Sequence, residues 1–204
     1  MILNQQTEMV SKKIDQLFRT RRLAEHCEQV HVYNATTLLQ KLKELQFTIY
    51  DLDKHFEYNW HLNDEAIHSC WMQILQRLYE ITHGQQNLEE LVSDIRKYQR
   101  FEEAIRNPFD FSLPSVSQYY YLKTCDVRLA RRLITLQKGS SLSLTAEYLQ
   151  SWQLFDLISE VCDDLEDIHE DILTFNGNRF LLGIGLFGAE VTIKELEFNM
   201  EVQL

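Results

Sequence analysis

The segment from Trp152 to Arg179 holds the densest group of side chains that could do chemistry. On a helix with 3.6 residues per turn, Asp164 lies at the border of one packing stripe, which consists of Leu154, Leu157, Ile158, Val161, Leu165, Ile168 and Ile172. Carboxylates three, four and seven residues apart repel one another, and Mg²⁺, which prefers carboxylate and phosphate oxygens, would relieve that repulsion. We therefore expect a Mg²⁺ site at Asp163, Asp164 and Asp167. The alternative is an acidic, solvated helix face, on which the further carboxylates turn outward from the stripe: Asp156, Glu160 and Asp171.

Asp126 is a second carboxylate whose position requires a partner. It lies in the middle of the apolar face of a helix predicted from Ser115 to about residue 138. Burying a lone carboxylate costs several kcal/mol, so we expect a structural ion pair with Lys123, hydrogen bonds to a helix end, or a role in a binding site. Three arginines of the same segment are candidates for the mouth of a substrate pocket: Arg128, Arg131 and Arg132.

The elements that must position these residues are helices. Among 204 residues there are only 2 prolines and 6 glycines, and apolar residues recur at helical spacing. This predicts an all-α fold, a single domain over residues 1–204 that forms a bundle of about seven helices. In chain order, the predicted helices cover about 3–31, about 34–60, a stretch that ends before Gly84, about 86–107, 115 to about 138, a stretch that begins near Leu144, and about 189–202. A proline-containing corner is expected at 108–114, and a bend or mobile segment is expected in the glycine-rich stretch before 189.

Two motifs of this chain resemble those of a known family. Lys123-Thr124 precedes Asp163-Asp164-x-x-Asp167, with 39 positions from Thr124 to Asp163. This is similar to the C-terminal half of class I isoprenoid diphosphate synthases, the trans-prenyltransferase and terpenoid synthase superfamily. The similarity covers about residues 119–179. It implies an isoprenoid-synthase-like fold, Mg²⁺ bound by the three aspartates and bridged to a diphosphate, and a lysine at position 123 that contacts the diphosphate.

The N-terminal half departs from the family pattern. It has no DDxxD motif, and Asp51, Asp53 and Glu57 form only a loose acidic group. The resemblance therefore implies a divergent protein that binds a prenyl diphosphate through Mg²⁺. Whether it is an enzyme, as a Mg²⁺-dependent prenyltransferase or terpene synthase would be, stays open.

Two other interpretations remain. Glu-x-x-His, the ligand spacing of di-metal carboxylate bundles, occurs four times, although Glu65 and Glu166 are expected to face solvent. The other interpretation is a non-enzymatic acidic helical adaptor that binds a partner protein through exposed tyrosines of the triplet Tyr119, Tyr120 and Tyr121.

Charge and composition limit the partners and the compartment. The net charge of −11 argues against nucleic acid as the main partner. The four widely spaced cysteines suit reduced thiols better than a disulfide framework or a zinc site. No apolar run is long enough to cross a membrane, so we expect a cytoplasmic protein, and a homodimer is left open.

Overall fold

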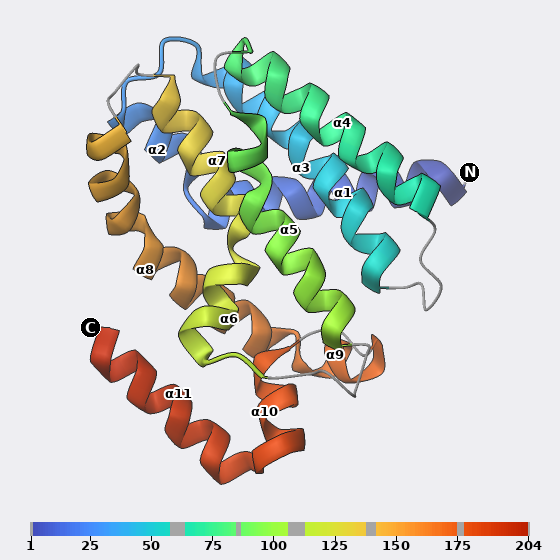
Figure 1. Cartoon of the computed structure of the whole chain (residues 1–204), viewed down its shortest axis with the longest axis vertical. Helices are drawn as coiled ribbons and strands as arrows, with labels where there is room; N and C mark the ends of the chain where they lie inside the picture. Colours follow the sequence, from blue (N-terminus) through green and yellow to red (C-terminus); the bar gives the residue numbers. More distant parts are fainter. Residues whose placement is uncertain are drawn as a thin grey trace. The chain divides into compact units, whose positions relative to one another are not determined.

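A computed structural model of the chain describes residues 2–57, 64–84, 87–105, 113–137, 142–174 and 178–203. Within these ranges the chain forms eleven α-helices and no β-strand, which confirms the all-α prediction (Figure 1). The expected number of about seven was too low, because three predicted helices are each divided in two and the glycine-rich stretch is itself helical. The predicted corner at 108–114 lies mostly outside the described residues.

The first division separates α1 (Ile2–Thr20) from α2 (Leu23–Gln29). Arg22, between them, has φ 52° and ψ 41°, a left-handed conformation that ends a right-handed helix. Leu23 and Cys27 on α2 are both buried. Phe18 on α1 is buried too, so apolar residues face the core from both helices, although Ala24 on α2 is exposed.

A second division falls at Thr124, between α6 (Val116–Lys123) and α7 (Cys125–Leu136). The Thr124 hydroxyl donates to the carbonyl oxygens of Tyr120 at 2.9 Å and Tyr121 at 3.2 Å. Such bonds from a threonine side chain to the preceding turn compete with the regular helical pattern and bend the chain. The helical phase predicted across 115–138 is therefore not continuous.

The third division lies inside the acidic segment, between α8 (Leu142–Glu166) and α9 (Ile168–Thr174). The backbone N–H of Asp167 still donates to Asp163 O at 2.9 Å, and that of Asp171 to Asp167 O at 2.9 Å. The chain therefore bends at Asp167 without losing these bonds.

The glycine-rich stretch forms α10 (Arg179–Phe187). Asn178 caps it, because the Asn178 side-chain oxygen accepts from the N–H groups of Phe180 at 3.0 Å and Leu181 at 3.3 Å. The expected bend is confined to Gly188, whose φ is +85°. The last helix, α11 (Ala189–Gln203), follows and agrees with the predicted 189–202.

The structure divides into two compact units, of which unit 1 comprises residues 1–93 and 126–150. Its center is the pair α3 (Ala35–Glu57) and α4 (Asp64–Thr82), which run antiparallel and share an extensive contact (Figure 1). The predicted stripe of the first of these helices is confirmed, since five of its members are buried: Leu38, Leu42, Leu45, Ile49 and Leu52. Helices α1 and α2 pack against α3.

Unit 2 comprises residues 94–125 and 151–204, and α5 (Leu88–Ile105), α7 and α8 contribute residues to both units. Its core joins α6, α8 and α11 through six buried side chains: Val116, Tyr119, Tyr120, Leu157, Val161 and Leu196. The Phe101 and Tyr119 rings meet edge to face, with centroids 5.4 Å apart. The single-domain expectation stays a prediction.

Among the helices in the described ranges, none has the length together with the apolar character that a membrane crossing requires.

Candidate functional site

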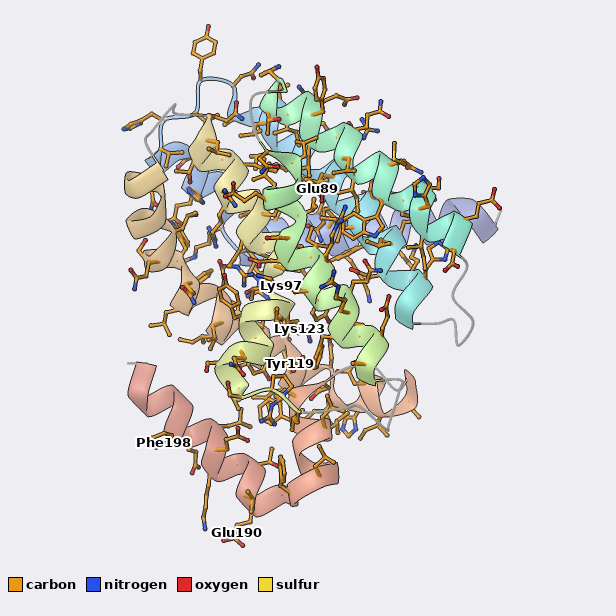
Figure 2. The ribbon with its side chains drawn as sticks, viewed as in Figure 1. Glu89, Lys97, Tyr119, Lys123, Glu190 and Phe198 are labelled. Carbon is orange, nitrogen blue, oxygen red and sulfur yellow. The ribbon has the colours of Figure 1, made fainter. Side chains whose placement is uncertain are left out.

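Lys123 and Asp164 are brought together by α6 and α8 of unit 2. α6 begins at a capping box in which the Ser115 hydroxyl accepts from the Gln118 N–H, and it ends at Lys123, which is labelled in Figure 2. The Lys123 ammonium forms an ion pair with Asp164 Oδ1 and lies 4.0 Å from Glu160 Oε2, one helical turn earlier. Two residues that the sequence assigned to one site are therefore in contact.

The second oxygen of Asp164 is also occupied by protein donors. Asp164 Oδ2 accepts from the Tyr120 hydroxyl at 2.9 Å and from the backbone N–H of Arg179 at 3.2 Å. The Asn178 amide donates to the backbone oxygen of Asp164 and to Asp171 Oδ2, both at 2.7 Å. Asp164 is 1% exposed, and these bonds offset the cost of its burial.

The pKa values of the neighbouring side chains follow from this burial. Burial alone would lower the pKa of Lys123, but the negative charges of Asp164 and Glu160 raise it above its ordinary value, so the ammonium stays charged. Burial, together with the Asp164 charge, raises the pKa of both Tyr119 and Tyr120. Both phenols are therefore neutral, and Tyr120 acts as a hydrogen-bond donor to the carboxylate.

The three aspartates of the predicted metal motif differ in exposure. Asp164 is buried, Asp163 is half-buried and Asp167 is exposed. On a helix, residues four apart share a face, whereas the next residue is turned by about 100°. Asp163 and Asp167 are therefore the pair closest to solvent, and Asp164 is turned toward the interior, where Lys123 meets it.

The expected outward direction of the other carboxylates is wrong for three of them. Asp156, Glu160 and Asp171 are buried, while Leu165 and Ile172 of the predicted stripe are about half exposed. Donors supplied by other helices explain part of this reversal, since Lys123 approaches Glu160, and Asn178 bonds to Asp171. Hydrophobic periodicity places polar residues outside and takes no account of such donors.

Asp126 does not pair with Lys123, whose ammonium is directed to Asp164. It belongs to unit 1, where Asp126 Oδ2 accepts from Gln46 Nε2 and Oδ1 from the Val127 N–H, both at 2.6 Å. Burial raises the pKa of Asp126, although these hydrogen bonds and the charge of Arg21 act in the opposite direction. The only sequence signal for Gln46 is that this polar residue stands next to Leu45, a member of a buried apolar stripe.

The three arginines expected at a pocket mouth also belong to unit 1. Arg131 is 1% exposed, and its guanidinium donates to Arg21 O at 2.8 Å and contacts His26 Nδ1 at 3.3 Å. Arg132 pairs with Glu90 on α5, and Arg128 is half-buried. Arg131 is thus part of an internal network, whereas a substrate-binding role for Arg128 and Arg132 stays a prediction.

The four Glu-x-x-His pairs all lie on the surface. The eight side chains concerned are exposed: Glu28, His31, Glu65, His68, Glu80, His83, Glu166 and His169. This confirms the expectation that Glu65 and Glu166 face solvent. A di-metal site in a bundle core needs inward-facing ligands, so these pairs do not supply one.

The tyrosine triplet is mostly interior, which corrects the expectation for an adaptor surface. Tyr119 and Tyr120 are fully buried, and only Tyr121 is exposed, with its hydroxyl 3.5 Å from Asp94 Oδ2. Exposed apolar residues occur elsewhere in unit 2, on α9, α10 and α11: Ile172, Leu173, Leu186, Phe187, Val191 and Phe198. Phe198 is labelled on α11 in Figure 2.

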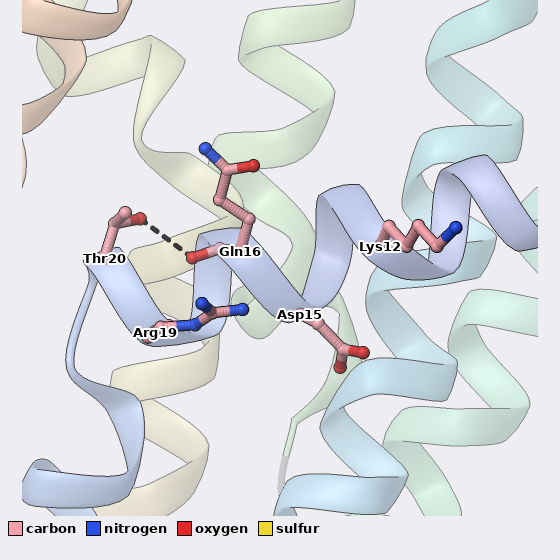
Figure 3. A pocket seen from close by; sticks show the side chains of 5 residues that line it. All are labelled: Lys12, Asp15, Gln16, Arg19 and Thr20. Atoms are coloured by element: carbon pink, nitrogen blue, oxygen red, sulfur yellow. Dashed lines mark hydrogen bonds between the residues drawn. The ribbon is translucent and has the colours of Figure 1, made fainter.

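A shallow hollow in unit 1 follows one face of α1 (Figure 3). Five side chains of that helix line it: Lys12, Asp15, Gln16, Arg19 and Thr20. The Thr20 hydroxyl donates to Gln16 O at 3.1 Å, and Asp15 pairs with Lys43 at 2.5 Å. The hollow is open and mixed in charge, so its lining is unsuited to a prenyl chain.

Comparisons of the sequence with protein-family models and with curated proteins, and of the structure with solved structures, found no match. The resemblance to isoprenoid diphosphate synthases therefore remains a hypothesis that rests on the motifs in residues 119–179.

Proposed function

We propose that this protein binds a prenyl diphosphate through Mg²⁺ held by Asp163, Asp164 and Asp167, with Lys123 contacting the diphosphate. The observation that carries the proposal is the ion pair between Lys123 and Asp164. A site for a metal–diphosphate complex needs an acidic group for the metal and a cation for the phosphate at one place. The ion pair supplies both.

Binding would proceed by exchange of partners. Without ligand, the Lys123 ammonium neutralises Asp164 Oδ1. With ligand, Mg²⁺ takes over that oxygen, and the diphosphate takes over the ammonium, so that each charge keeps a partner of opposite sign. Tyr120 can remain bonded to Oδ2 throughout. Asp163 and Asp167, which are nearer to solvent, would complete the metal's protein ligands.

The proposed function is binding, and turnover stays open, because a second aspartate-rich motif is not visible in the N-terminal half of the sequence. The proposal uses Lys123 as its substrate-binding cation. Asp126 and Arg131 have partners within unit 1, so no role in diphosphate binding is assigned to them.

Isothermal titration with farnesyl diphosphate, with and without Mg²⁺, tests the proposal. Asp167→Asn is the decisive variant, because Asp167 is exposed and its replacement leaves the core intact. We expect Mg²⁺-dependent binding by the native chain that is weakened at least about tenfold in Asp167→Asn and in Asp163→Asn. Glu166→Gln is the matched control, since it removes an exposed charge next to Asp167 that is not one of the three aspartates. Absence of Mg²⁺-dependent binding by the native chain would refute the proposal.

A second candidate function is the binding of a partner protein through the exposed apolar residues of α9, α10 and α11. Leu173 is 81% exposed and Phe198 is 65% exposed, and groups of exposed apolar side chains are typical of protein-binding surfaces. The same titration separates the two functions, because an adaptor would bind no farnesyl diphosphate in the presence of Mg²⁺.

A further inference from the structure

Asp51, His55 and Cys70 form a cluster of metal-binding side chains in unit 1. Asp51 and His55 are one turn apart on α3, and Cys70 lies on α4, the helix packed against α3. One ligand atom from each residue lies within 4.8 Å of the other two. The cluster shares no residue with the proposed diphosphate site, which belongs to unit 2.

The spacing of two of these atoms already suits a tetrahedral metal ion. Cys70 Sγ lies 3.7 Å from Asp51 Oδ2. With Zn–S of about 2.3 Å and Zn–O of about 2.0–2.2 Å, tetrahedral zinc would hold the two atoms about 3.5 Å apart. The third ligand atom, on the His55 ring, lies within 4.8 Å of both, and His55 makes no hydrogen bond or ion pair with the described residues.

The Cys70 thiol and the Asp51 carboxylate are joined by a hydrogen bond. The Cys70 thiol donates to Asp51 Oδ2 across the 3.7 Å between the two atoms. A divalent cation could replace that proton and hold both atoms, since metal binding releases thiol protons. Lys54 does not compete directly, because its ammonium lies 3.9 Å from the other oxygen, Oδ1.

The three ligand atoms are a sulfur, an imidazole nitrogen and a carboxylate oxygen, and this combination indicates which metal ion the cluster would bind. Mg²⁺ prefers oxygen ligands, whereas Zn²⁺ accepts sulfur, imidazole nitrogen and carboxylate oxygen together. We propose that Asp51, His55 and Cys70 bind one Zn²⁺ ion between α3 and α4, with a fourth position for water. The site would then join these two helices by a metal bridge.

The test uses the full chain, freed of metal with a chelator and then titrated with Zn²⁺. We expect one Zn²⁺ per chain, and an affinity at least about tenfold weaker in His55→Ala. Co²⁺ serves as a spectroscopic probe, because a Co²⁺–thiolate bond absorbs in the near ultraviolet. That absorption should appear in the native chain and in the matched control Cys162→Ser, and it should be lost in Cys70→Ser.

Two results would overturn the proposal: no Zn²⁺ binding by the native chain, or Zn²⁺ binding that His55→Ala leaves unchanged. If Cys70→Ser fails to fold because Cys70 is buried, His55→Ala and Asp51→Asn still decide, since both side chains are partly exposed. The outcome is independent of the farnesyl diphosphate titration, which depends on residues of unit 2.

Discussion

Asp126 on α7 of unit 1 and Asp164 on α8 of unit 2 are both carboxylates on helices, but their side chains have different partners. Asp164 receives the Lys123 ammonium as well as neutral donors, whereas Asp126 accepts hydrogen bonds from the Gln46 amide and a backbone N–H. Burial raises the pKa of Asp126 despite those bonds. Neutral donors therefore satisfy the hydrogen-bonding geometry of a half-buried carboxylate such as Asp126, whereas a cation such as Lys123 also stabilises a carboxylate's charge.

The largest expected effect comes from removal of the cation in unit 2. Lys123→Met keeps most of the aliphatic volume but leaves Asp164 buried without its ammonium, so we expect the free energy of unfolding to fall by about 3–5 kcal/mol. Urea unfolding at neutral pH measures it. Lys194→Met is the matched control, because its pair with Glu190 is exposed on both sides and should change stability by less than about 0.5 kcal/mol. Similar losses in the two variants would mean that Lys123 adds nothing beyond a surface pair.

A smaller effect is expected from acid, through the buried His26 of unit 1. Arg131 Nη1 donates to His26 Nδ1, and the Thr135 hydroxyl, which donates to Arg131 O, can accept from His26 Nε2–H. Burial is the main cause that lowers the pKa of His26 from 6.5 to about 3, and the charge of Arg131 is the second cause. The unfolded chain therefore takes up a proton that the folded chain excludes.

The sign of the pH dependence follows from that difference. The stability associated with neutral His26 is fully present above pH 6.5 and is lost as the pH falls toward 3, with a loss of about 3 kcal/mol at pH 4. Urea unfolding at pH 7 and pH 4 measures the loss, and it should be smaller in His26→Gln. An equal loss in the native chain and in His26→Gln would assign the acid sensitivity to other groups.

The smallest effect is expected for Asp126→Asn, and it tests the difference between Asp126 and Asp164 most directly. A carboxyl whose pKa is raised on folding holds its proton more tightly in the folded state, so ionised Asp126 opposes folding at neutral pH. We expect Asp126→Asn to stabilise the chain at pH 7 by up to about 1 kcal/mol, with no gain below the ordinary aspartate pKa. Asp164→Asn should instead destabilise it. Urea unfolding at pH 7 and at a pH below the ordinary aspartate pKa measures the stability of both variants. Equal destabilisation by Asp126→Asn and Asp164→Asn would contradict the difference between the two carboxylates.

Much of the fold could be predicted from the sequence, because long apolar stripes dominate helices such as α3. The stripe from Leu38 to Leu52 is buried as its spacing predicted. The helix breaks were missed, since they depend on a left-handed Arg22 and on a hydroxyl bond from Thr124, for which the local sequence has only weak signals. Asn178, which caps α10, likewise outweighs the glycines that suggested a bend.

The candidate sites were harder to predict, because their partners are far apart in the sequence. Only the family resemblance assigned Lys123 and Asp164 to one site, and their direct contact was not predicted. Gln46, 80 positions from Asp126, carried no signal of its own. The cluster of Asp51, His55 and Cys70 has no recognisable ligand spacing, since it forms only where α3 and α4 pack together. Periodicity identifies buried faces, whereas polar partners follow from the packing of helices.

The exposure of Cys162 gives the acidic helix a chemical reporter. The other three cysteines are buried, and burial raises the pKa of Cys27 to about 11, which keeps that thiol protonated and slow to react. A maleimide or disulfide reagent should therefore label Cys162 first. Cys162 directly precedes Asp163, so a ligand bound at the neighbouring aspartates should change the rate at which Cys162 is labelled. That rate then reports whether the proposed site is occupied.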